Sequence, residues 1–201
     1  MEKNRIEAFS DGVIAIIITL LVLEIKVPHL EGEVTASAIL SALAKLTPKI
    51  LSWALSFFMI LIMWVNHHRI FTEIKESDNG LLWANGLLLF FMSFVPFPTA
   101  FMGDYFSQSA SMAFFGVCMG LAAVSFVVLR YYIYTHPHLL KDGTNLAGYR
   151  KLISASWAGP ILYFVGAAVA LLNVYAAFTI FAIVPVYFVF FGTKKKNGEK
   201  K

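Results

Sequence analysis

The stretch RIEAFSDGVIAIIITLLVLEIK, residues 5–26, decides the fold, because it places twelve uncharged residues, Gly12 to Leu23, between the carboxylates of Asp11 and Glu24. At a rise of about 1.5 Å per residue this run makes roughly 18 Å of helix, whereas a lipid-facing span needs roughly 20 apolar residues. A helix that crosses the bilayer here therefore carries its carboxylates at membrane depth, where they must face protein or water. The stretch is typical of a helix that lines the inside of an assembly.

The composition is that of an integral membrane protein. Of the 201 residues, 59% are hydrophobic and 14% are charged, and the mean hydropathy is +0.72. A soluble domain carries about 25% charged residues. The single cysteine, Cys118, excludes a disulfide framework or a cysteine metal cluster within one chain, and it is expected to be a small hydrophobic residue. No cleavable signal peptide is evident.

Uncharged stretches predict six spans, and so an all-α bundle of six transmembrane helices. The first helix is expected over residues 4–27, ending before Pro28, and residues 36–48 are expected to lead along the membrane surface into the second. Later spans are predicted at 50–68, 80–103 and 105–129, and the uncharged run 152–193 predicts two more with Asn173 at the tip of their hairpin. The predicted domain is therefore residues 1–193, followed by a basic tail, 194–201.

Lysine and arginine fall unevenly on the two sides of these six spans. Thirteen lie on the side that holds both termini and three (Lys26, Lys45 and Lys49) lie on the other. The positive-inside rule then predicts that both termini are cytoplasmic and that the protein is a multi-pass protein of the cell membrane. The net charge of +4 bears on orientation, and no nucleic-acid partner is expected.

Four residues of the first helix form one stripe: Ile16, Thr19, Leu20 and Leu23 stand at i, i+3, i+4 and i+7. Such a stripe commonly packs in a bundle core. Because acidic residues bracket it, it also fits a narrow apolar constriction with wet ends, which filters ions by the cost of dehydration. Glu24 would then stand at a pore mouth. One chain cannot line a pore with one helix, so this interpretation requires a closed oligomer.

The remaining polar residues of the spans suggest a structural network. Ser10 and Asp11 resemble a helix cap, but a cap there would leave the first helix too short to span. Arg5 and Asp11 lie about 120° apart on a helix and need partners on another helix or subunit. Asn66, His67 and Asn85 are candidate partners, although two histidines at the end of the second span, His67 and His68, are more typical of polar anchors at the membrane interface.

Three motifs resemble one family. The pattern Arg5-xxx-Phe9-Ser10-Asp11 is similar to the RxxxFSD signature that opens the first helix of the transmembrane protein 175 family of potassium channels. The segments 64–69 (WVNHHR) and 94–100 (FVPFPTA) resemble the ends of that family's second and third helices. A single six-helix repeat is similar to its prokaryotic members.

The resemblance implies a homotetramer in the lipid bilayer, with the first helix of each subunit around a central pore for monovalent cations. It places the constriction at Ile16, Leu20 and Leu23, a polar layer at Thr19, and a structural role on Arg5, Phe9, Ser10 and Asp11. No cofactor is implied, and K⁺ is the permeating ion, weakly preferred over Na⁺. Where some members carry a serine, this chain has Ala15, and its first constriction residue is Ile16 rather than leucine.

The sequence thus predicts a potassium-permeable cation channel without a carbonyl filter. The alternative is a secondary transporter or proton-coupled carrier, which would want an ionisable residue near the midplane and discontinuous helices. An enzyme is not expected, since the chain has no Gly-rich phosphate loop, nucleophile elbow or HExxH motif.

Overall fold

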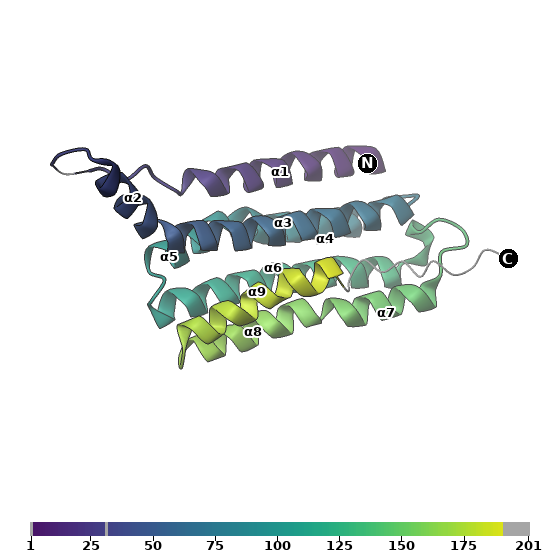
Figure 1. Cartoon of the computed structure of the whole chain (residues 1–201). Coiled ribbons are helices and arrows are strands. Elements are labelled where there is room, and N and C mark those ends of the chain that lie inside the picture. Colours follow the sequence, from purple (N-terminus) through teal and green to yellow (C-terminus); the bar gives the residue numbers. More distant parts are fainter. Residues whose placement is uncertain (1, 31, 191–201) are drawn as a thin grey trace.

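The computed structural model describes residues 2–30 and 32–190, which form a bundle of helices (Figure 1). The helices, in chain order, are α1 Lys3–Leu23, α2 Ala36–Lys45, α3 Thr47–Glu73, α4 Asn79–Phe94, α5 Pro96–Asp104, α6 Ser109–Thr135, the 3-10 helix η1 Pro137–Leu139, α7 Leu146–Ser156, α8 Ala158–Ala170 and α9 Val174–Phe190. The prediction of an all-helical fold is therefore confirmed for the described part of the chain.

Five segments of the described chain are long and apolar enough to cross a membrane: α1, α3, α4 with α5, α6, and α7 with α8. The two composite spans bend at a single residue, Val95 before Pro96 and Trp157 shortly before Pro160. Proline cannot donate the hydrogen bond that would continue the first helix, so each span restarts there. The last apolar helix, α9, is shorter, and residues 191–193 of the predicted sixth span lie outside the described residues, as does the predicted tail 194–201.

Several predicted helix ends are wrong. The first helix ends at Leu23 rather than residue 27, because the Ile25 N–H bonds to Val22 O at 3.1 Å and closes the last turn. The second and fourth predicted spans continue to Glu73 and Thr135, since Ile70, Phe71 and Ile133 are buried and extend the packed face of each helix past the first charged residue. The hairpin tip was placed correctly, for Asn173 accepts from the N–H groups of Tyr175 and Ala176 at the start of α9.

The bundle is built around α6, which packs against α4, α5, α7, α8 and α9. Its approach to α8 and α9 depends on Gly116, where a β-carbon would lie 2.7 Å from Phe181 and 2.9 Å from Ala167. Small residues allow such close approach between membrane helices. In contrast, within the described chain α1 packs mainly against α3, α4 and α5 and runs along one edge of the bundle (Figure 1). One side of α1 is therefore left uncovered.

Polar contacts tie the connections together at the end of the bundle where α1 begins. Asp78 accepts from the Leu81 N–H at 2.7 Å, which caps α4, and from the Tyr132 hydroxyl at 2.9 Å. Burial opposes ionisation of Asp78, but these two hydrogen bonds together with the nearby His136 and His138 hold the pKa of Asp78 below its usual value. Lys75 and Asp142 form an ion pair at 2.9 Å, which links the α3–α4 and η1–α7 connections.

Candidate functional site on the first helix

The first helix has two unlike faces. Its buried face carries Ile6, Ser10, Ile14, Ile17 and Leu21, all turned into the bundle. Ile16 is 60% exposed, whereas the next residue, Ile17, is 2% exposed. Neighbouring helical residues point about 100° apart, so this contrast defines which side of α1 the rest of the chain covers.

The uncovered face of α1 carries the whole predicted stripe. Leu20 and Leu23 are 43% and 60% exposed, and Thr19 is exposed with its hydroxyl bonded to Ala15 O and Ile16 O of its own helix. The stripe therefore presents three apolar side chains and one hydroxyl, which already donates a hydrogen bond within its own helix. Nothing in the described chain packs over this face.

Phe9 and Arg5 extend the same uncovered face toward the start of α1. They precede Ile16 by seven and eleven residues, which places each within about 20° of it around the helix. Phe9 is 64% exposed and Arg5 is exposed. No side-chain hydrogen bond within the described chain joins Arg5 or Phe9 to Ser10, which lies on the opposite, buried face, and a partner on another subunit stays a prediction. The seven-residue spacing between Phe9 and Ile16 could have predicted that Phe9 lies on the exposed face of the helix.

A buried polar cluster, Ser10, His67 and Asn85, holds the other face of α1 to α3 and α4. The Asn85 amide donates to Ser10 Oγ at 2.8 Å, and its oxygen lies 2.8 Å from His67 Nε2. Because a carboxamide oxygen only accepts, His67 donates from Nε2. The Ser10 hydroxyl in turn donates to Ile6 O at 2.8 Å. All three side chains are buried, so these contacts fix the rotation of α1 about its axis.

Asp11 and Glu7 meet α3 beside this cluster. The Trp64 indole N–H donates to Asp11 Oδ1 at 2.8 Å, and His68 Nδ1 lies 3.2 Å from Glu7 Oε1. Asp11 is inside α1 rather than at its cap, which agrees with the sequence argument. The tryptophan partner was missed, since a Trp in a span is normally read as a packing or interface residue.

Asn66 does not belong to the polar cluster, contrary to the prediction. Its amide donates to Ile62 O at 2.9 Å, and its oxygen accepts from Arg130 at 3.3 Å. As the residue before His67, it points about 100° away, toward α6 rather than α1.

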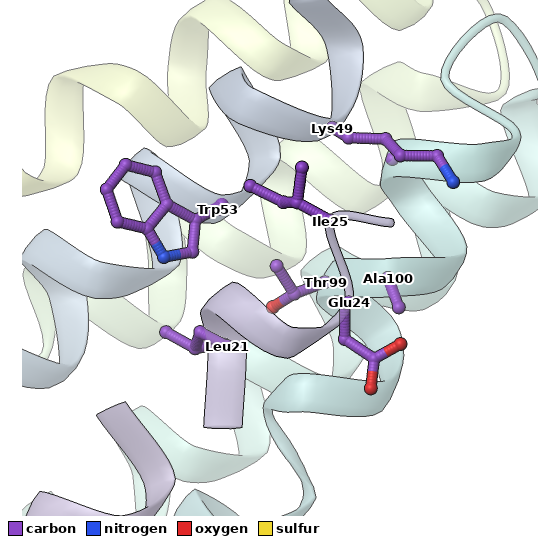
Figure 2. Close-up of a pocket in the computed structure, with 8 residues that line it drawn as sticks. Leu21, Glu24, Ile25, Lys49, Trp53, Thr99 and Ala100 are labelled. Carbon is purple, nitrogen blue, oxygen red and sulfur yellow. The ribbon is translucent and has the colours of Figure 1, made fainter. Parts of the chain in front are cut away.

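Glu24 lies at the far end of α1, exposed, as the residue that follows the last helical turn. There α1 meets α3 and α5 around a cavity of about 10 Å³, whose lining residues include Glu24, Lys49, Trp53 and Thr99 (Figure 2). This volume is about enough for one water molecule, so the cavity has no room for an organic ligand. The chemistry of the site therefore lies on the open face of α1.

Comparison with known proteins relates the chain to one family. The family model for the endosomal/lysosomal potassium channel TMEM175 matches residues 5–96. A potassium channel of Chamaesiphon minutus is 39% identical over 191 residues, which cover 93% of each chain. A potassium channel of a Chryseobacterium species is 42% identical over 130 residues, which cover 64% of each chain.

The fold comparison agrees with the sequence comparison. The crystal structure of a lysosomal potassium-selective channel TMEM175 homolog from Chamaesiphon minutus matches with a TM-score of 0.83 and 36% identity, over 96% of this chain and 99% of that one. The apolar helices and the open face of α1 thus occur in a membrane channel protein rather than an enzyme. The chain belongs to the TMEM175 family.

The polar cluster yields a stability prediction. Replacing Asn85 with alanine leaves His67 Nε2 and the Ser10 hydroxyl without this partner in a dry interior, which should cost about 2 kcal/mol or more. The expected result is a Tm several degrees lower in detergent, measured by scanning fluorimetry. Asn79→Ala, on the exposed first turn of the same helix, is the control and should change the Tm little. Equal Tm values for the two variants would contradict a stabilising role for the cluster.

Proposed function

We propose that the chain assembles as a homotetramer in the cell membrane and conducts K⁺ through a central pore lined by α1. The observation that supports this best is the uncovered face of α1, which presents Ile16, Leu20 and Leu23 while the opposite face is held by buried hydrogen bonds. Relatives of the chain are named potassium channels. A channel needs a surface that its own subunit leaves free, and α1 has one.

The polar residues along α1 argue against lipid as the cover for this face. Arg5 lies at one end of it, Thr19 within it and Glu24 at its far end, all exposed. Charged side chains at membrane depth are costly toward lipid and face protein or water instead. Four copies around an axis bring these groups to an aqueous pore or to a neighbouring subunit, where Arg5 finds the partner that the described part of its own chain does not offer.

The proposed subunit has six spans with both termini in the cytoplasm. Five come from α1, α3, α4 with α5, α6, and α7 with α8, and α9 is the sixth. Its 17 residues make roughly 25 Å of helix against the roughly 30 Å of a bilayer core, and the uncharged run of the sequence reaches residue 193. The charge bias of the loops supports this orientation.

Permeation in this proposal is governed by dehydration. A ring of Ile16 side chains offers an ion no ligand, so an ion that passes it sheds water without replacement. K⁺ is less strongly hydrated than Na⁺ and loses less, which gives a modest preference for K⁺. Leu20 and Leu23 add apolar layers. The Thr19 hydroxyl already donates within its helix, so its oxygen rather than its proton faces a cation.

The assembly itself is testable by native mass spectrometry in mild detergent. We expect a tetramer for the unaltered chain and a loss of tetramer for Asp11→Ala, because that change removes the Trp64 hydrogen bond and loosens α1 against α3. Monomers or dimers alone for the unaltered chain would contradict the proposal. A fully assembled Asp11→Ala channel with only its conductance altered would instead make Asp11 a charge at the pore.

The pore face is testable in planar bilayers with K⁺ on one side and Na⁺ on the other. Ile16→Asn should raise unitary conductance and shift the reversal potential, because amide groups stand in for lost water. Ile17→Asn, one residue along the same helix, places the amide in the bundle and should reduce the amount of folded protein rather than alter permeation. The pore face is wrong if Ile17→Asn alters the reversal potential and Ile16→Asn does not. The absence of unitary currents from the unaltered chain would indicate a carrier.

A further inference from the structure

A buried arginine lies in the membrane-spanning part of the molecule, away from α1. Arg130 is 9% exposed and stands in α6, eight residues from the middle of that helix. This distance is about 12 Å along the axis, just inside the edge of a hydrocarbon core whose half-thickness is roughly 15 Å. The predicted span 105–129 leaves Arg130 outside the membrane, because the apolar run of the sequence ends at Leu129. In the structure, α6 continues past Arg130 and ends at Thr135.

All the described partners of Arg130 are neutral. One terminal nitrogen, Nη1, donates to Ser156 Oγ at 2.8 Å and to Leu152 O at 3.4 Å, and Nη2 donates to Asn66 Oδ1 at 3.3 Å. The guanidinium carbon lies 5.0 Å from the centre of the Phe126 ring. Its Nε–H is buried and finds no acceptor among the described residues. No carboxylate of the described chain pairs with Arg130, so its positive charge is uncompensated.

A cavity of about 190 Å³ opens beside this guanidinium, between α3, α6, α7 and the end of α9. Arg130, Asn66 and Ser156 form its polar part, and Met59, Met63 and Phe126 are among its apolar walls. A single water molecule needs roughly 10–15 Å³ of such volume, so this cavity is many times larger than one water. That is enough for an anionic head group and the start of an attached chain, with the rest of the ligand outside.

An unpaired charge near hydrocarbon is expensive unless an opposite charge meets it. A guanidinium presents its donors in a planar fork that suits phosphate and carboxylate oxygens. The exposed cations Arg69 and Arg150 lie on the neighbouring ends of α3 and α7 and strengthen the local field for an anion. The methionine and phenylalanine walls suit acyl carbon rather than water.

We propose that this cavity binds the phosphate of an anionic membrane phospholipid, with Arg130 as the charged partner, Asn66 and Ser156 as polar neighbours, and Met59, Met63 and Phe126 against its apolar part. The site is separate from the open face of α1, and the proposal does not rest on conduction. A bound lipid would join α3, α6 and α7 and so stabilise the folded subunit by mass action.

The test uses the full chain in a neutral detergent and measures Tm with added phosphatidylglycerol, phosphatidylcholine or inorganic phosphate. We expect phosphatidylglycerol to raise the Tm by roughly 3 °C, phosphatidylcholine to raise it less, and inorganic phosphate to leave it unchanged. Arg130→Gln should abolish the response to phosphatidylglycerol. Lys141→Gln removes a positive charge from an exposed residue that does not line the cavity and should keep the response.

A second variant makes the test independent of the folding of Arg130→Gln. Ala155 lines the cavity and is exposed, so Ala155→Phe covers the opening while every hydrogen bond of Arg130 stays in place. This variant should have the Tm of the unaltered chain in the absence of lipid and should lose the increase in Tm with phosphatidylglycerol. Equal responses in the unaltered chain and Ala155→Phe would overturn the site. A response in Arg130→Gln equal to that of the unaltered chain would show that Arg130 only links helices and does not bind the lipid. An Arg130-dependent response to inorganic phosphate as large as that to phosphatidylglycerol would identify a free anion and overturn the lipid.

Discussion

The two hydrogen bonds of Asn85, one to Ser10 and one to His67, are the interaction on which the placement of α1 depends. In a bilayer, apolar helix faces gain little from leaving lipid for one another, so packing and polar contacts decide how a helix is turned. The described part of α1 packs mainly against α3, α4 and α5, and most of that contact is aliphatic. Aliphatic contact alone would tolerate a rotated helix. A buried amide bonded on both sides does not, because rotation leaves its partners unpaired. The uncovered face of Ile16, Leu20 and Leu23 follows from that fixed rotation.

Adjacent residues of α3 connect this cluster to the arginine cavity. His67 faces α1 and α4 through Asn85, whereas Asn66 faces α6 and accepts from Arg130. The two side chains diverge because neighbouring helical positions point about 100° apart. One turn of α3 thus contributes to two polar sites on opposite sides of the bundle. A ligand beside Arg130 that shifts α3 would therefore also shift His67, which faces α1 and α4.

Much of the fold could be predicted from the sequence, because long uncharged runs indicate membrane spans and a few residues indicate the turns between them. The runs predicted the five long apolar segments that the described residues contain, and Asn173 marked the hairpin between α8 and α9. Helix ends were predicted less well. Ile70, Phe71 and Ile133 continue their helices past charged residues, since burial on one face outweighs a charge on another. Charge alone does not mark where a helix stops.

For the candidate site, periodicity predicted that Ile16, Leu20 and Leu23 share a face, and the exposures agree, since all three are exposed while the neighbouring Ile17 is buried. That this face lines a pore stays a prediction. The bond between Trp64 and Asp11 and the burial of Arg130 could not be predicted, because each depends on residues more than 20 positions apart in sequence. Single-sequence patterns report which face a residue occupies and not which helix comes to meet it.

Cysteine accessibility tests the central claim most directly. Cys118 is first replaced by serine, and single cysteines are then placed at Leu23 and Ile17 in channels reconstituted in a planar bilayer. If α1 lines the pore, a charged water-soluble thiol reagent added from the side of Glu24 should block current through Leu23→Cys and leave Ile17→Cys unaffected. Block of Ile17→Cys with no effect on Leu23→Cys would place the pore on the other side of α1 and contradict the account.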